Sequence, residues 1–410
     1  MDCKEVKSML LQFRFKNYKS FPDEITIDLM ATNIKEHQNT LLEVNGIKVL
    51  PVAAVFGANA SGKSNLFLAF NSMKTTVLYS NNQNKLISVV PYIFNINLIE
   101  LPTEYEVSIN IGDLEYRYGF ECNKDEIISE WLFKKPFVKN TRAKEKLVFY
   151  REKDTVEFGK LTENELEELE YAHNMALKSQ LFLNIVGNRN KVQLADIYNW
   201  FNNSYSFNMA DSHTENMLND VNVEYLYHNK IIKDSTEELI KTIDPDILGL
   251  KIESYKDENL NEKFKCYSVH RVDNGQTVSI PFDIESSGTK KILSIAVGMF
   301  LTLRNGSTFF VDELDAKLHP LLLRYIVQLF TNKKINIANS QIVFSAHNIV
   351  CLDSSDLRRD EIWFVEKNNQ KSQLFSLYDF KLDNNSIRSD LSFGKHYLAG
   401  RFGAVPFQKE

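Results

Sequence analysis

Apolar and polar residues alternate along the first part of the chain, as they do in strands with one buried face. Within residues 11–29 the alternation is interrupted by Phe21-Pro22-Asp23, which predicts a strand, a turn and a strand. Residues 51–56 are almost continuously apolar, a pattern typical of a strand buried on both faces of a parallel sheet. Helical spacing follows over 66–73. Short alternating runs within 105–150 predict an antiparallel sheet attached to this lobe.

The pattern changes to helical spacing after residue 160. Thr162 and Glu165 have the spacing of a capping box, and apolar residues then recur every three or four positions. We therefore predict a first α/β lobe over 1–160 with an antiparallel β subdomain, a mainly helical insert over 161–250 and a second α/β lobe over 251–410. In that last part, buried strands are expected at 308–311 and 341–344, and a buried helix at 292–303.

Composition narrows the class of protein. Of the 410 residues, 43% are hydrophobic and 25% are charged, the balance of a globular chain. The apolar run at 292–303 is too short to cross a bilayer, and no secretion signal is recognisable, so we expect a cytoplasmic protein without membrane partners. The net charge of −6 argues against a surface devoted to nucleic acid, although the basic run from Lys134 to Arg151 leaves a local basic face open. A solvated hairpin is the more favoured interpretation of that run.

The motif Gly57-Ala-Asn-Ala-Ser-Gly62-Lys63-Ser64 stands between the predicted buried strand and the predicted helix. It satisfies the phosphate-loop pattern GxxxxGK(S/T) in the structural context that the pattern requires. Glycines let the backbone wrap closely around phosphates, and the helix start directs N–H groups at them. Lys63 is the predicted cation for the β and γ oxygens, and Ser64 the predicted hydroxyl ligand of Mg²⁺. The residues predicted to bind ATP are Gly57, Asn59, Ala60, Ser61, Gly62, Lys63, Ser64 and Asn65.

Two further predicted strands deliver polar residues at their carboxyl ends. Asp312 and Glu313 follow the strand at 308–311. Asp312 suits the Mg²⁺ shell, and Glu313 is placed to orient or deprotonate the attacking water. His347 follows the strand at 341–344, and since ligands bind at this edge of open α/β sheets, we predict that it senses the γ-phosphate. A structural role is the alternative for this histidine.

A Ser-x-Gly turn precedes the predicted buried helix. Ser286, Gly288 and Thr289 would present hydroxyl groups, backbone N–H groups and a helix dipole to an anion. Taken alone, without the other motifs, these residues are better interpreted as an ordinary helix cap.

The order of these motifs resembles that of the ATP-binding cassette (ABC) ATPases, especially the chromosome-maintenance and RecF-like branch. The opening Phe15-Lys-Asn-Tyr-Lys-Ser-Phe21 is similar to the first strand of that branch. A narrower resemblance, to bacterial AAA-family ATP-binding proteins of abortive-infection and phage-defence systems (the RloA-like group), lies in Ser286-Ser-Gly-Thr-Lys-Lys291, Asp312-Glu-Leu-Asp-Ala-Lys-Leu-His-Pro320, Ile362-Trp-Phe-Val-Glu366 and the tail Tyr397–Pro406.

The resemblance implies an ABC-type P-loop head with a mixed central sheet, a flanking antiparallel lobe and a helical insert. It implies that Lys63, Asp312, Glu313 and His347 act within one chain, together with Ser64. It further implies that Ser286, Gly288, Thr289 and Asp315 complete the site of a second copy, so that ATP drives dimerisation. Glu285 departs from the family pattern, which has an apolar residue there. Asn95 is the only residue that we can suggest for the loop that senses Mg²⁺.

The expected function is an ATPase that acts as a regulatory or sensor subunit of an anti-phage defence system. A separately encoded effector, a nuclease or a toxin, is the expected partner, since no acidic cluster follows His347. The alternative is a RecF-like repair or recombination ATPase that binds DNA. About 220 residues separate Ser64 from Glu285, too few for a long coiled-coil arm, which disfavours a role in chromosome cohesion.

Overall fold

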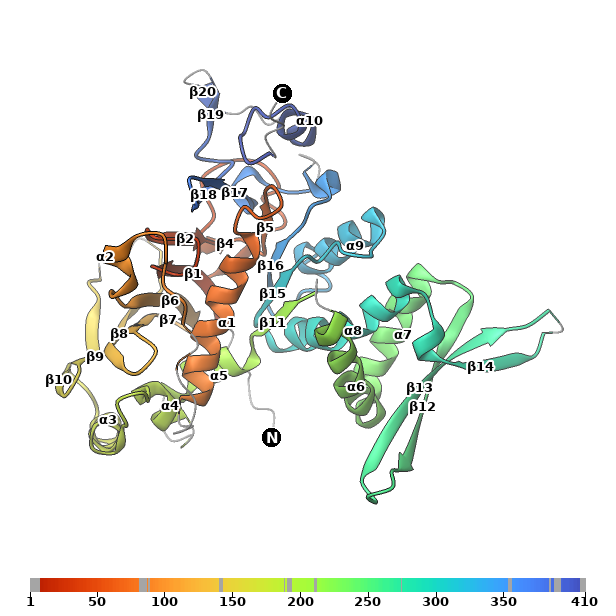
Figure 1. The fold of residues 1–410 in the computed structure, drawn as a ribbon, viewed down its shortest axis with the longest axis horizontal. Helices are drawn as coiled ribbons and strands as arrows, with labels where there is room; N and C mark the ends of the chain where they lie inside the picture. Colours follow the sequence, from red (N-terminus) through yellow and green to blue (C-terminus); the bar gives the residue numbers. More distant parts are fainter. Residues whose placement is uncertain are drawn as a thin grey trace.

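The computed structural model describes residues 8–80, 87, 89–139, 143–187, 189, 194–209, 212–273, 275–352, 356–382, 385–386 and 392–405. Two sheets form the body of the molecule, with helix α1 (Lys63–Tyr79) between them, and a three-stranded arm projects from one side (Figure 1).

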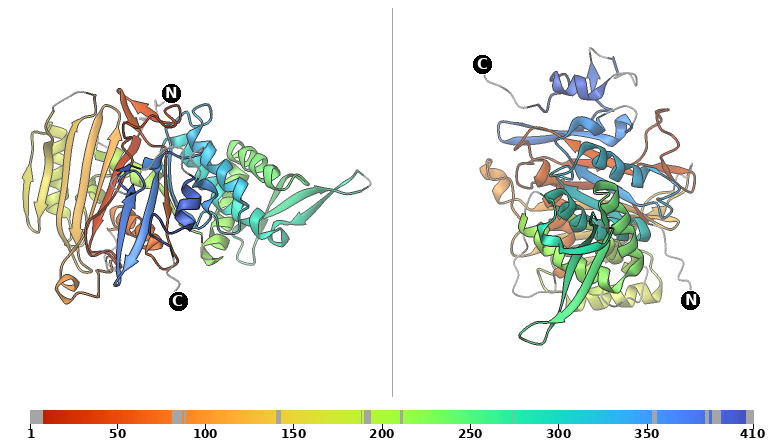
Figure 2. Two further views of the ribbon diagram at one scale, coloured as in Figure 1. Left: turned by 90° about the horizontal axis from the view of Figure 1, so that it is seen from above. Right: turned by 90° about the vertical axis from the view of Figure 1, so that its right-hand side faces the viewer.

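The first sheet is antiparallel, with the strand order β10-β9-β8-β7-β6-β1-β2 (Figure 2). Phe13 in β1 pairs with Ile27 in β2 and with Val107 in β6, so the strand, turn and strand predicted at 11–29 are confirmed, as is the antiparallel sheet within 105–150. Its strands are β1 (Ser8–Lys16), β2 (Ile25–Asp28), β6 (Thr103–Ile111), β7 (Leu114–Cys122), β8 (Ile127–Pro136), β9 (Lys146–Glu152) and β10 (Thr155–Phe158).

The second sheet has the order β11-β15-β16-β5-β17-β18, and all of its neighbours are parallel except β17 and β18. Every residue of β5, β15 and β16 is buried, which confirms the three buried strands expected from their apolar runs. The carboxyl ends of these three strands therefore meet at one edge. The strands are β5 (Val52–Phe56), β11 (Tyr205–Asn208), β15 (Thr308–Asp312), β16 (Gln341–Ser345), β17 (Ile362–Asn368) and β18 (Lys371–Ser376).

Helix α1 joins the two sheets through aromatic packing. Phe70 stacks on Phe310 of β15, with ring centroids 3.6 Å apart, and meets Phe13 of β1 edge-on at 5.4 Å. Trp200 of α5 (Leu194–Asn203) closes the same cluster against Phe70. Since aromatic contacts of this kind bury much apolar area, the amino end of α1 is held rigidly at the sheet edge.

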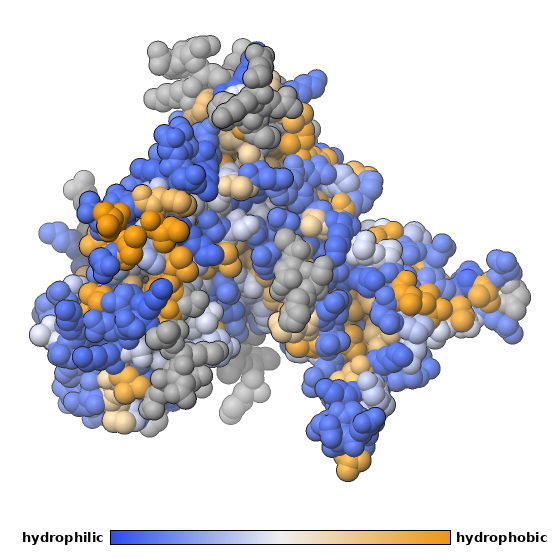
Figure 3. Space-filling view, viewed as in Figure 1, coloured by the Kyte–Doolittle hydropathy of each residue, from blue (hydrophilic) through white to orange (hydrophobic). Residues whose placement is uncertain are grey.

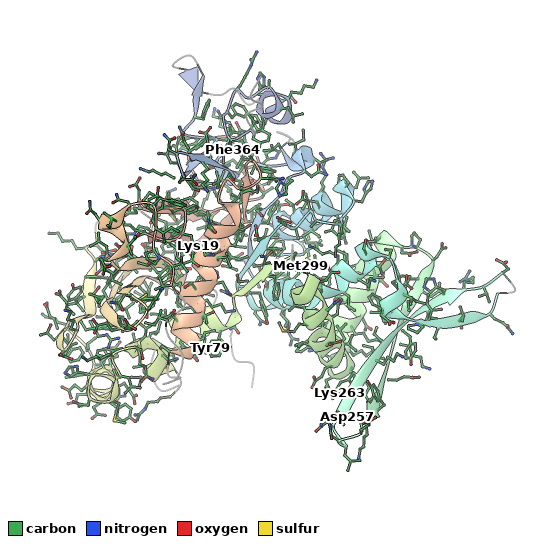
Figure 4. The ribbon with its side chains drawn as sticks, viewed as in Figure 1. Lys19, Tyr79, Asp257, Lys263, Met299 and Phe364 are labelled. Atoms are coloured by element: carbon green, nitrogen blue, oxygen red, sulfur yellow. The ribbon has the colours of Figure 1, made fainter. Side chains whose placement is uncertain are left out.

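The opposite face of the second sheet is covered by α8 (Ser287–Asn305) and α9 (Pro320–Thr331). Met299, near the middle of α8, is fully buried and belongs to the same core as Phe309 and Val311 (Figure 4). The expected buried helix at 292–303 is therefore confirmed, and it begins within the Ser-x-Gly turn.

The described residues of 161–250 form five helices, one complete strand and the start of a second strand at Ile247. The capping box of α3 is confirmed, because Thr162 Oγ accepts from Glu165 N at 3.3 Å and Glu165 Oε2 accepts from Thr162 N at 2.9 Å. Strand β11 of the second sheet also lies in this range, which the helical pattern did not predict. The helices are α3 (Glu163–Met175), α4 (Phe182–Gly187), α5, α6 (Ser212–His228) and α7 (Lys230–Ile243).

The projecting arm consists of β12 (Ile247–Lys256), β13 (Glu262–Arg271) and β14 (Thr277–Pro281), in that order. Asp257 and Lys263 lie near its tip, and α6 and α7 pack at its base (Figure 4). The sequence had no motif for this arm, whose outer half alternates weakly and is exposed on both faces.

The carboxyl-terminal tail packs beside the second sheet. Tyr397 in α10 (Phe393–Leu398) stacks on Phe364 of β17 at 5.3 Å, and Phe402 approaches the same ring at 5.8 Å (Figure 4). Pro406, the last residue of the tail motif, lies outside the described residues. Two small hairpins complete the chain, namely β3 (Leu42–Val44) with β4 (Ile47–Val49) and β19 (Lys381–Leu382) with β20 (Asn385–Ser386).

The surface bears on two of the expectations. Three basic residues of the run from Lys134 to Arg151 pair with carboxylates, for example Lys134 with Glu165 at 3.2 Å, which favours the solvated hairpin over a free basic face. Arg142 lies outside the described residues.

Apolar side chains gather over the short helix α2 (Ile96–Ile99), visible as an orange patch in Figure 3. In the part of the chain that the structure describes, no helix combines the length and apolar character needed to span a membrane.

Candidate nucleotide site

The loop between β5 and α1 has the backbone conformation that its glycines were predicted to supply. Gly57 has φ 155° and Gly62 has φ 113°, values that residues with a Cβ rarely adopt. A Cβ on Gly57 would collide with the carbonyl of Val365, and one on Gly62 with the hydroxyl of Ser372. The glycines are therefore required both by the turn and by the close approach of β17 and β18.

Hydroxyl groups from distant segments support this loop. Ser372, at the start of β18, donates to the carbonyl of Ser61 at 2.6 Å, and its oxygen lies 2.8 Å from that of Ser20. Ser20 in turn accepts from the amide of Asn65 at 2.8 Å. Ser20 belongs to the Phe15–Phe21 segment, so this amino-terminal segment helps to hold the phosphate loop in place.

Lys63 begins α1 and is 5% exposed. Its ammonium donates to the carbonyls of Gly57 at 2.7 Å and Ala58 at 3.1 Å. Burial lowers the pKa of Lys63, while the carboxylates of Asp312 and Glu313 oppose the shift. The side chain is thus a largely desolvated cation, the form that interacts most strongly with an anion.

One serine organises the acidic pair at the end of β15. Ser345, at the end of β16, donates to Asp312 Oδ1 at 2.5 Å and accepts from the backbone N–H of Glu313 at 2.8 Å. The other oxygen of Asp312, Oδ2, is buried without a hydrogen-bond partner. A buried carboxylate oxygen left unpaired is costly, so this atom is suited to a cation or to a water held by one.

Glu313 has φ 55°, a left-handed conformation that is uncommon for a residue with a side chain. Its carboxylate lies 3.7 Å from Nε2 of His347, which follows β16. Asp315 accepts from the backbone N–H groups of His347 at 2.9 Å and of Asn348 at 2.7 Å. The carboxyl ends of β15 and β16 are therefore joined by the hydrogen bonds of the Asp315 carboxylate as well as by those of Ser345.

The phosphate loop and the ends of β15 and β16 face a common cavity of about 700 Å³, which is large enough for a nucleotide. Glu313 and His347 line it, and so does Lys367 at the end of β17, which the sequence reasoning missed. The signal was present, because Lys367 directly follows the Ile362–Glu366 motif. The remaining lining residues are Asn59, Ala60, Ser61, Gly62, Lys63, Ser64 and Asn65.

Asn95 is not part of this cavity. It caps α2, where its side chain accepts from the N–H of Asn97 at 3.0 Å. The suggestion that Asn95 senses Mg²⁺ is therefore not supported by its position.

The Ser-x-Gly turn lies at the start of α8 and does not line the cavity of its own chain. Ser286 caps the helix by accepting from Thr289 N at 3.1 Å, and its hydroxyl lies 2.8 Å from that of Thr289. Ser286 and Ser287 are exposed. Gly288 packs closely, since a Cβ there would lie 3.2 Å from the carbonyl of Lys317. The helix start is thus capped and open to solvent.

Glu285, the departure from the family pattern, has a structural partner. His270 Nε2 lies 2.7 Å from Glu285 Oε1, and the hydroxyl of Ser268 donates to the same oxygen. Both partners belong to β13 of the arm. A carboxylate in place of an apolar residue therefore links the arm to the turn that begins α8.

Asp315, which was expected to complete the site of a second copy, also has contacts within its own chain. Its Oδ2 holds the loop after β16, and its Oδ1 is buried without a partner. Asp315 thus orders the loop that carries His347, and its role in a second copy stays a prediction.

Comparison with known proteins decides the family. The family described as "AAA domain, putative AbiEii toxin, Type IV TA system" matches residues 52–353, about three quarters of the chain. The chain belongs to this AAA family. The matched range includes the phosphate loop, the Ser-x-Gly turn, the acidic pair and His347, and it excludes the amino-terminal strand and the tail. No curated protein matches the sequence.

Solved structures similar to this AAA-family chain include heads of SMC proteins. The SMC head domain from Thermotoga maritima is 14% identical, with a TM-score of 0.43, and the match covers 91% of this chain and 99% of that one. The Smc head domain with a coiled coil and joint from Pyrococcus yayanosii is 9% identical, with a TM-score of 0.43 and coverage of 96% and 99%. The fold of this chain is mixed α/β, with β5, β15 and β16 side by side in the second sheet and the phosphate loop between β5 and α1.

Proposed function

We propose that this AAA-family protein binds and hydrolyses ATP. The observation that supports the proposal most directly is the convergence of Lys63, Glu313 and His347 on one cavity beside the glycine-supported loop. A cation, a carboxylate and an imidazole in this arrangement suit phosphoryl transfer to water, in which positioning and charge stabilisation do most of the catalytic work.

Mg²⁺ fits the residues present. Asp312, which directly precedes Glu313 of the cavity wall, offers a buried carboxylate oxygen without a partner, and Ser64 lines the cavity itself. These two residues would hold the ion together with phosphate oxygens and water. When bound, Mg²⁺ neutralises charge on the β- and γ-phosphate oxygens. Among the described residues, no group of three or more His, Cys, Asp or Glu side chains would hold a metal ion by itself.

The chain's own residues then divide the work. Lys63 binds phosphate oxygens, and the N–H groups at the start of α1 add to this binding. Glu313 orients the attacking water and accepts its proton as the water oxygen bonds to the γ-phosphorus and the bond to the β–γ bridging oxygen breaks, releasing ADP and phosphate. His347, 3.7 Å from Glu313, completes the wall that faces the γ-phosphate.

A second copy of the chain is the proposed source of the remaining contacts. Ser286, Gly288 and Thr289 do not line the cavity of their own chain. They stand at the start of α8, where Ser286 is exposed and Thr289 is buried, and a helix start suits an anion. We propose that they close over the nucleotide of a partner subunit, so that ATP stabilises a homodimer and hydrolysis releases it.

Replacement of the proposed base tests both parts of this proposal. Glu313→Gln keeps the shape of the side chain but cannot accept a proton, so kcat should fall by about 10²- to 10³-fold while ATP binding persists. The variant should accumulate as a dimer with ATP and Mg²⁺, as measured by light scattering. Glu258→Gln, on the exposed tip of the arm, is the matched control. Unchanged turnover in Glu313→Gln would remove Glu313 from the role of base.

The biological role that we propose is that of an ATP-dependent regulatory or sensor subunit in anti-phage defence, controlling a separate nuclease or toxin. Support comes from the family description, which names a toxin of a toxin–antitoxin system, and from the motif resemblance. The second candidate, a repair ATPase that binds DNA, would show ATP hydrolysis stimulated by double-stranded DNA. Affinity purification from the native cell with and without a non-hydrolysable ATP analogue tests the defence role. An effector recovered only with the analogue supports it, and DNA-dependent turnover with no protein partner contradicts it.

A further inference from the structure

Helix α8 carries a fully buried lysine in its second turn. Lys291 stands five residues after Ser286 and is 0% exposed. Its ammonium donates to the backbone carbonyl of Met209 at 3.1 Å and lies 3.4 Å from that of Glu313. Within the described part of the chain, none of the ion pairs involves Lys291.

A lysine at this position is costly to the fold. Burying an ammonium group with no carboxylate at ion-pairing distance carries a desolvation penalty. The two carbonyl contacts and the more distant carboxylates of Glu215, Asp315 and Glu313 offset this penalty only in part. Burial accordingly lowers the pKa of Lys291 to about 8. A methionine of similar length would fill the same space in this apolar helix at lower cost. Because the buried ammonium group destabilises the fold, its presence favours a functional role for the positive charge at this position.

The carbonyl groups of Met209 and Glu313, which Lys291 contacts, indicate what this role is. Met209 follows β11 and Glu313 follows β15, and the two strand ends are already joined because Met209 N donates to the carbonyl of Asp312 at 3.1 Å. Glu313 has an unfavourable positive φ, with its N–H held by Ser345. Lys291 holds the other side of the same residue, so the Glu313 backbone is fixed from both β16 and α8.

We propose that Lys291 is a positioning residue that couples the Ser-x-Gly turn to Glu313 of the same chain. When the turn closes over the partner's nucleotide, α8 and its ammonium set the backbone of Glu313 in the chain's own site. The two nucleotides of a dimer are thereby hydrolysed cooperatively, because each turn serves one site and each Lys291 serves the other. This inference rests on the proposed ATPase dimer.

The first test replaces the charge. Lys291→Met should lower kcat about 10- to 100-fold and reduce the Hill coefficient for ATP to about 1, with KM within about twofold of wild type. Arg304→Met removes one positive charge from the exposed far end of the same helix, and it should leave all three values unchanged. Thermal unfolding identifies any misfolded variant, and Lys291→Gln, which retains a donor, then takes the place of Lys291→Met.

Mixed dimers distinguish positioning from a merely structural role. One chain carries Glu313→Gln, which keeps ATP binding, so that both turns can close over a nucleotide while only the other chain hydrolyses it. Lys291→Met in the chain with intact Glu313 should abolish most of the turnover, whereas Lys291→Met in the Glu313→Gln chain should leave it unchanged. Loss in the second dimer alone, or equal loss in both, would overturn the inference, because Lys291 would then shape only the turn or the fold.

The failure of the inference can be told apart from the failure of the proposed function. A wild-type chain that neither hydrolyses ATP nor dimerises with it contradicts both. A wild-type chain that hydrolyses ATP cooperatively while Lys291→Met behaves identically contradicts the role of Lys291 alone.

Discussion

The edge of the sheet that carries the acidic pair and the start of α8 are built in opposite ways. At the carboxyl ends of β15 and β16, Asp312, Glu313 and His347 are held by contacts within the chain, from Ser345 and from main-chain groups. At the start of α8, Ser286 and Thr289 bond chiefly to each other, and Ser286 faces solvent. The side chains at the sheet edge are thus fixed by their own chain, whereas the start of α8 presents the hydroxyl of Ser286 to solvent.

This difference shows how one fold can separate chemistry from control. Groups that carry out the reaction must be fixed before the substrate arrives, because reorganisation at that moment would raise the barrier. Groups that respond to assembly must be exposed until the partner arrives. The contacts that connect the turn to the rest of the molecule include those of Glu285 and Lys291. The predictions below perturb first the fixed region and then the exposed one.

The largest effect is expected for Lys63→Ala. The substitution removes the desolvated cation beside the loop, so ATP affinity should fall by about 10²-fold or more, since hydrogen bonds to charged groups contribute about 1.5–3 kcal/mol each. Calorimetric titration with ATP and Mg²⁺ measures this. Lys263→Ala, near the tip of the arm, changes the same charge far from the cavity and should bind ATP normally. Equal affinity in the two variants would contradict the phosphate-loop assignment.

A smaller loss is expected for Ser345→Ala. Without the hydroxyl, Asp312 loses its donor and the N–H of Glu313 loses its acceptor, so kcat should fall about 10-fold and half-maximal turnover should need more Mg²⁺. ATP binding should change little. Turnover measured against Mg²⁺ concentration at saturating ATP gives both values.

Ser340→Ala provides the matched control for that experiment. Ser340 is equally buried, at the other end of β16, where it donates to the carbonyl of Thr302 at 2.7 Å. Its loss should cost about 1 kcal/mol of stability and leave the Mg²⁺ dependence unchanged. If both serine variants lose activity in parallel, Ser345 stabilises the strand and does not arrange the acidic pair.

The fixed region was largely predictable from the sequence, because local patterns determine it. Apolar runs identified β5, β15 and β16, and the parallel order of strands brings the residues after them to one edge. Lys63, Asp312, Glu313 and His347 were therefore predicted to lie near one another, as the structure places them around the phosphate loop. Family membership over residues 52–353 is consistent with that motif order.

The remainder depends on contacts between residues distant in sequence, which no local pattern contains. No sequence motif pointed to Ser345, because its bridging role follows from the alignment of β16 with β15. Strand β11 and the arm lie in segments whose alternation is weak. Glu285 was noted as a departure without an explanation, since its partners Ser268 and His270 are reached only through the folding of β13.

The smallest effect, and the one that most sharpens the contrast between the two regions, is expected for Glu285→Gln. The amide keeps the size of the side chain and one acceptor but loses the charge that faces His270, so the arm should hold the turn less firmly. ATP-dependent dimerisation should weaken about two- to fivefold, measured by sedimentation, while ATP affinity of the monomer stays the same. Glu262→Gln, exposed on the same strand β13, is the matched control. Weakened ATP binding by the monomer would place Glu285 in the fixed region instead, whereas unaltered dimerisation would mean that the arm does not act on the turn.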